Sequence, residues 1–106
     1  MPLASRLSLA GDACRLRLAD GEGRELVIER SPGRLCVTRR DPVSPFLDTV
    51  REVALAGSGS VDVWLDAGSV ELLADGGAVS LTMQHRLSGE TVSRSIDMTC
   101  RNSQAA

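Results

Sequence analysis

The stretch VDVWLDAGSVELLADGGAVSLT, residues 61–82, decides the fold of this chain. Apolar and polar residues alternate along it with a period of two, which is typical of β-strands that bury one face. Two short breaks interrupt the alternation, at Ala67-Gly68 and at Asp75-Gly76-Gly77. Glycine and aspartate at such breaks favour tight turns. The stretch therefore predicts three consecutive strands joined by two short connections.

The alternation also predicts which side chains of this stretch face the core. On its first strand, Asp62, Trp64 and Asp66 share one face, and on the second Ser69, Glu71 and Leu73 do so. The opposite faces of the three strands hold the side chains that we expect to join the sheets: Val61, Val63, Leu65, Val70, Leu72, Val79 and Leu81.

Period-two alternation continues outside this stretch, and helical periodicity is almost absent. Only residues 48–56 offer a helical alternative, and the β-branched content and the following Gly-Ser-Gly-Ser favour a strand or edge instead. The Pro-containing residues 41–47 are expected to carry the chain from one sheet to the other. In all, the pattern predicts an all-β, antiparallel two-sheet β-sandwich of about eight or nine short strands. The expected strands are 13–20, 24–30, 34–40, 48–56, 60–66, 69–74, 78–86 and 91–100.

Composition sets the class of protein. With 106 residues, 42% of them hydrophobic, the chain suits one domain, which we place at 1–100 with a polar tail at 101–106. Its net charge of −2 and scattered arginines argue against nucleic-acid binding. No apolar run reaches the about 18 residues of a membrane span, and no signal peptide is recognised, so a cytoplasmic location is the default expectation. Cys14, Cys36 and Cys100 are expected to be small buried thiols in a reducing compartment.

Residues 66–82 resemble a segment of a known protein family. Asp66, then Ser69-Val70-Glu71, then Asp75-Gly76-Gly77, then a strand ending in Leu81-Thr82 resemble a recurring segment in the C-terminal β-sandwich of glycoside hydrolase family 32. That family contains invertases, sucrose-6-phosphate hydrolases and levanases. Two positions depart from its pattern: Ala67 stands where arginine is usual and Leu73 where phenylalanine is usual.

The resemblance implies a non-catalytic module. In family 32 the two catalytic carboxylates belong to an N-terminal propeller, for which this chain has no room, so no catalytic residue is predicted. Arg40-Asp41-Pro42 matches a propeller motif, but in a Pro-rich loop it indicates ordinary turn chemistry. The implied role is structural, through a catalytic propeller domain or self-association by a sandwich face or edge strand, or sugar-assisting. The alternatives are a stand-alone carbohydrate-binding module using Trp64 and an unrelated β-sandwich interaction protein.

The candidate carbohydrate contacts are Trp64, Asp62, Asp66 and Glu71. An indole on a polar face suits stacking on a sugar ring, filling a domain interface, or packing under a neighbouring loop. Asp66 and Glu71 would approach each other near the end of a hairpin, as a carboxylate pair or a Ca²⁺ site, although a solvated or hydrogen-bonded face is the favoured interpretation. Asp66 and Ser69 are expected to cap the turn. His85 is expected at the surface or at a strand end. No metal or cofactor motif is found, so neither is expected.

Overall fold

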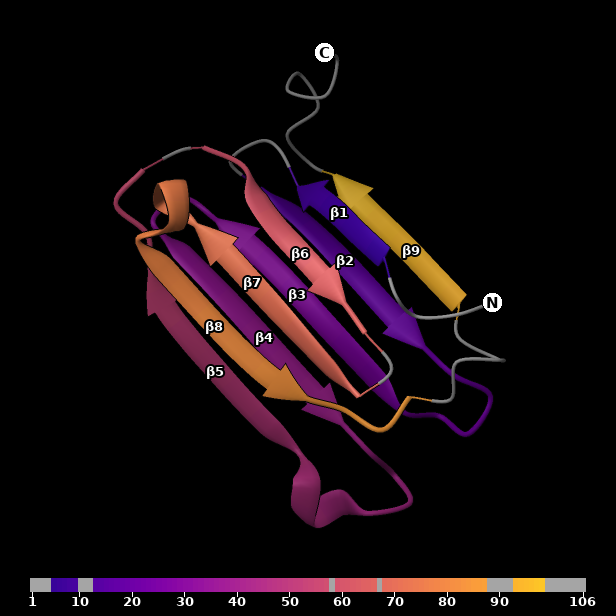
Figure 1. Ribbon diagram of the computed structural model, residues 1–106. Helices are drawn as coiled ribbons and strands as arrows, with labels where there is room; N and C mark the ends of the chain where they lie inside the picture. The colour runs from indigo at the N-terminus through magenta and orange to yellow at the C-terminus, as the bar shows by residue number, and fades with distance from the viewer. Residues whose placement is uncertain (1–4, 10–12, 58, 67, 88–92, 99–106) are drawn as a thin grey trace.

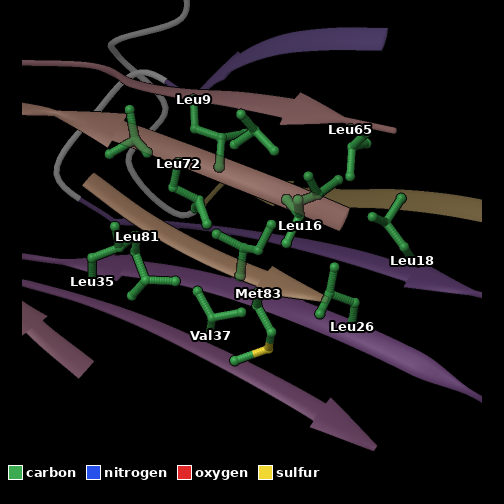
Figure 2. Packing of buried hydrophobic residues seen from close by; sticks show 14 of the residues in the cluster. Leu9, Leu16, Leu18, Leu26, Leu35, Val37, Leu65, Leu72, Leu81 and Met83 are labelled. Carbon is green, nitrogen blue, oxygen red and sulfur yellow. The ribbon is translucent and has the colours of Figure 1, made fainter. Parts of the chain in front are cut away.

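The computed structural model describes residues 5–9, 13–57, 59–66, 68–87 and 93–98 (Figure 1). In these residues nine strands form two antiparallel sheets, and the molecule measures 36 × 25 × 21 Å along its principal axes. The sheets lie face to face and their apolar faces meet (Figures 1 and 2). The predicted all-β two-sheet sandwich is confirmed.

The four-stranded sheet has the order β1-β6-β7-β8. The decisive stretch supplies three of its strands, β6 (Val61–Leu65), β7 (Ser69–Ala74) and β8 (Val79–Gln84), as predicted. The fourth, β1 (Ser5–Leu9), was not predicted, although Leu7 and Leu9 alternate with Arg6 and Ser8. It pairs antiparallel with β6.

The five-stranded sheet has the order β5-β4-β3-β2-β9. Its strands are β2 (Cys14–Ala19), β3 (Glu25–Ser31), β4 (Arg34–Arg40), β5 (Thr49–Ala54) and β9 (Ser93–Met98). β2 to β5 form an uninterrupted meander, and β5 lies at one border of the sheet. Within residues 48–56, Thr49–Ala54 therefore form a strand and not the helical alternative. Gly23 (φ +84°) and Gly33 (φ +78°) occupy the two tight turns, where a positive φ favours glycine.

The core lies between the two sheets and is almost entirely aliphatic (Figure 2). Leucine and valine side chains from both sheets reach 0% exposure, and each fully buried one contributes about 1.5–3 kcal/mol. Of the seven predicted core residues of the decisive stretch, six are buried and Val79 is partly buried against them. Cys14 is buried with this core and Cys36 is half-buried, whereas Cys100 lies outside the described residues.

One prediction about the chain path is wrong. Residues 41–47 do not cross between the sheets, because they join β4 to β5, two paired strands of the same sheet. Within this loop Pro45–Leu47 form a single 3₁₀ turn, η1. The chain crosses instead between the end of β5 at Ala54 and the start of β6 at Val61.

The crossing loop is held by one side chain from each sheet. Arg30 of β3, only 3% exposed, donates from Nη1 to the carbonyl oxygen of Gly59 and from Nη2 to that of Gly57 at 3.2 Å. Asp75, in the β7–β8 turn η2 (Asp75–Gly77), accepts the backbone N–H groups of Ala56 (2.8 Å) and Gly57 (3.0 Å). A β-carbon on Gly57 would stand 3.0 Å from Asp75 Oδ1, so a larger residue there would require the carboxylate to shift by a few tenths of an ångström.

Among the described residues, no helix has the length and apolar character needed to cross a membrane.

Candidate functional site

The outer face of the four-stranded sheet carries the candidate site. β6 turns Val61, Val63 and Leu65 into the core and leaves Asp62 and Trp64 outward, as its alternation predicted. Trp64 is 44% exposed, so it is not packed under a loop, which was one of the expected possibilities. An indole of this size left open to solvent is an uncommon use of the only tryptophan in the chain.

Strand register places three polar or charged neighbours in line with Trp64. Arg6 of β1 lies directly opposite Trp64, Glu71 of β7 lies opposite on the other side, and Thr82 of β8 follows Glu71. Together with Asp62, these residues are called the Trp64 face below. Cross-strand neighbours on one face of a sheet are close enough for their side chains to interact.

Arg6 makes the principal contact with the indole. Its guanidinium carbon lies 4.8 Å from the centroid of the Trp64 ring, which is a cation–π distance. Arg6 Nη2 also lies 3.5 Å from Asp62 Oδ2. Because the side chains of Arg6 and Asp62 are 57% and 32% exposed, water screens this ion pair, and it adds little to stability. The arrangement presents an ordered aromatic and charged surface to solvent.

The four acidic residues of the decisive stretch lie at different places and make different contacts. Asp62 pairs with Arg6, and Asp75 holds the crossing loop. Glu71 is exposed opposite Trp64, while Asp66 lies at the hairpin end, where its N–H donates to the carbonyl oxygen of Ser69 at 2.9 Å. The register therefore does not pair Asp66 with Glu71 directly. No group of three His, Cys, Asp or Glu side chains gathers around a possible metal position in the part of the chain that the structure describes.

Asp41 of the Arg-Asp-Pro sequence is a turn residue. It is 3% exposed, and its Oδ1 accepts the N–H groups of Val43 (3.0 Å) and Ser44 (3.1 Å). Its Oδ2 lies 3.4 Å from Arg24 Nε, and its own N–H donates to Asp48 Oδ1 at 2.8 Å. These contacts are the turn chemistry that the sequence predicted, and they order the whole loop between β4 and β5.

His85 follows the end of β8, as predicted, but it is not at the surface. The residue is 6% exposed, and its Nε2 lies 3.0 Å from the carbonyl oxygen of Asp66. Its Nδ1 accepts the N–H of Leu87 at 3.2 Å, which makes Nε2 the protonated nitrogen of the neutral ring. Burial lowers the pKa of His85 below its ordinary value, although hydrogen bonds to the backbone of Asp66 and Ser69 act in the opposite direction. The contact with the turn between β6 and β7 joins residues that are distant in the sequence, so sequence reasoning did not find it.

Sequence reasoning missed Arg6, because the strand that carries it was not predicted. The signal was present in the alternation of Ser5–Leu9, but five residues are a short pattern. Only the β1–β6 register shows that Arg6 stands opposite Trp64.

Comparisons with protein-family models, with curated proteins and with solved structures found no match for this chain. The resemblance to the family 32 sandwich therefore stays a prediction.

Proposed function

We propose that this chain is a non-catalytic β-sandwich module that docks onto another protein domain through the Trp64 face. The observation that carries the proposal is the exposed indole of Trp64 with the Arg6 guanidinium held over it at 4.8 Å. Tryptophan and arginine are enriched among the few residues that contribute most of the binding energy at protein interfaces. A stacked pair of the two, exposed on the outer face of a sheet, is suited to that role.

The surroundings of the pair support docking. Asp62 positions Arg6, and Thr82 and Glu71 extend the same row across the sheet, so the indole has polar neighbours on several sides. An apolar centre with a polar rim is the usual anatomy of a protein interface. The partner that the family resemblance suggests is a fructosidase propeller domain, which a sandwich of this type would support.

Fluorescence provides a direct test, because Trp64 is the only tryptophan. A family 32 propeller produced without its own sandwich is added to the chain. We expect a blue shift of the Trp64 emission and co-elution of the two proteins on gel filtration. Trp64→Ala should abolish co-elution, whereas Phe46→Ala, which removes an exposed aromatic outside the Trp64 face, should leave it intact. Absence of co-elution, or equal loss in both variants, would contradict this partner.

The non-catalytic part of the proposal has its own assay. The purified chain is incubated with sucrose, levan and inulin, and released fructose is measured. We expect none above a buffer control. Robust fructose release would contradict a non-catalytic role.

A second candidate, carbohydrate binding, is favoured by one observation: the carboxylates of Asp62 and Glu71 belong to the same outer face as the exposed indole. Aromatic stacking with flanking hydrogen-bond acceptors is chemically suited to a sugar ring. Titration with fructans and other glycans would then shift the Trp64 emission, and Glu71→Gln or Asp62→Asn would weaken the response. An unchanged emission spectrum at millimolar sugar would reject this candidate and leave docking in place.

A further inference from the structure

β5 presents an open strand edge. It pairs only with β4 among the described strands, and Figure 1 shows it at the border of the five-stranded sheet. Beyond its end, the N–H of Leu55 donates toward Gly33 of the β3–β4 turn at 2.9 Å. Because backbone groups alternate in direction along an antiparallel strand, Val50, Glu52 and Ala54 direct their N–H and C=O groups away from β4.

The edge of the neighbouring strand β8, unlike that of β5, is covered by arginine side chains. Its outward carbonyl oxygens at Thr82 and Gln84 accept hydrogen bonds from Arg51 Nη1 (3.2 Å) and Arg39 Nη1 (2.7 Å), which project from the other sheet. Arginine caps of this kind prevent another strand from pairing there. Within the part of the chain that the structure describes, β5 has no such caps, so the two adjacent edges differ in accessibility.

Exposed apolar side chains gather beside the open edge. Val43, Phe46 and Val50 are 58%, 83% and 64% exposed, and with Trp64 they are the large hydrophobic residues that the described surface exposes. The first two lie in the loop that leads into β5, and that loop is ordered by the side chains of Asp41 and Asp48. An ordered loop lowers the entropic cost of binding.

We propose that β5 is a docking edge, to which an extended peptide segment of another protein adds as a further antiparallel strand. The partner segment carries an apolar side chain opposite Val50 and a basic side chain opposite Glu52. Strand addition of this kind obtains affinity from main-chain hydrogen bonds and specificity from alternate side chains. This surface lies on the other sheet from the Trp64 face, and the proposal does not depend on the function proposed above.

Charge on β5 argues for a different protein rather than a second copy. Two antiparallel two-fold registers keep five of the six β5 residues paired, namely Thr49–Val53 and Val50–Ala54. The first is centred on Arg51 and the second on Glu52, so each places a charged side chain opposite the same charge of the other copy. Like charges directly opposite destabilise a strand pair. A partner without this symmetry can place lysine opposite Glu52 and glutamate opposite Arg51.

The test uses the full chain and a synthetic peptide, acetyl-Val-Thr-Lys-Glu-Ile-Thr-amide, whose lysine falls opposite Glu52 in the antiparallel register. Titration is followed by two-dimensional amide NMR. We expect saturable shifts of the Val50, Glu52 and Ala54 amides, with the Trp64 indole N–H unchanged. Failure to move the β5 amides at millimolar peptide would overturn the proposal, as would shifts confined to the Trp64 face.

Two variants and one control variant give the test its specificity. Val50→Pro removes only an outward N–H, so the fold should persist by circular dichroism while peptide affinity falls about tenfold. Glu52→Lys should reverse the preference, with about fivefold tighter binding of a peptide carrying glutamate in place of lysine. Glu71→Lys, a matched change on the other sheet, should leave the preference unaltered. Equal binding of both peptides to Glu52→Lys would overturn the proposal. A concentration-dependent shift of the β5 amides without peptide would also overturn it and assign the edge to a second copy.

Discussion

The imidazole Nε2 of His85 lies 3.0 Å from the carbonyl oxygen of Asp66, so the segment after β8 is tied to the turn between β6 and β7. The ring is buried and its Nδ1 accepts the N–H of Leu87. Protonation of Nδ1 would abolish that acceptor inside a desolvated site. The bond therefore requires the neutral imidazole.

We predict that acid destabilises the fold through His85. Its folded pKa lies below the ordinary 6.5, so between these two values the unfolded chain binds a proton that the folded chain does not. The contribution of His85 to the free energy of unfolding is fully present above about pH 6.5. It falls as the pH drops toward the folded pKa, by at most about 1.4 kcal/mol per pH unit.

Urea unfolding at pH 7.5, 6.5 and 5.5 measures this slope. His85→Gln has no titrating ring and should show a flatter dependence, and the chain has no second histidine to confuse the comparison. Equal slopes in the two proteins would disprove the assignment.

Arg30 provides a prediction about a buried cation. Arg30→Ala should lower the free energy of unfolding by about 3 kcal/mol, because it creates a cavity and releases the carbonyls of Gly57 and Gly59. Arg30→Met should lose only about 1 kcal/mol, since it keeps the volume and removes the Nε, which has no hydrogen-bond partner among the described residues. Chemical denaturation of both variants measures the difference. A methionine variant as unstable as the alanine variant would show that the guanidinium itself stabilises the fold.

Asp41 is predicted to stabilise the loop between β4 and β5. Asp41→Ala removes the acceptor for the Val43 and Ser44 amides and the buried partner of Arg24, so we expect a loss of about 2–3 kcal/mol. Asp41→Asn keeps an oxygen acceptor and should lose about half as much. Thermal unfolding provides the measurement, with Asp62→Asn as a control at an exposed carboxylate. An Asp41→Ala variant that unfolds at the same temperature as the unmodified chain would refute this role.

Arg39 and Arg51 are predicted to keep the chain from assembling through β8. A double variant, Arg39→Gln with Arg51→Gln, frees the outward carbonyls of Thr82 and Gln84. Exposed strand edges favour pairing between molecules, so sedimentation velocity should show larger species as concentration rises. Arg40→Gln, a change at an exposed neighbouring residue, should behave as the unmodified chain. If the double variant sediments identically to Arg40→Gln, the two arginines do not protect this edge.

Local patterns in the sequence account for much of the fold. Alternation along residues 61–82 identified three strands and their buried faces, and alternation in residues 13–40 identified β2 to β4, because a strand's side-chain period depends only on the backbone. The same pattern placed Trp64 and Asp62 on a polar face. It failed at residues 41–47, because two prolines mark a loop but do not say which strands that loop connects.

Contacts between residues that are distant in the sequence could be seen only in the tertiary structure. The sequence by itself determined an aliphatic core, an antiparallel sandwich and an outward Trp64, since these follow from local alternation and composition. The pairing of β1 with β6 decided that Arg6 covers the indole, and the crossing of β5 to β6 decided that Arg30 is buried. Pairing of this kind depends on packing the whole sheet, so no short window of sequence contains it.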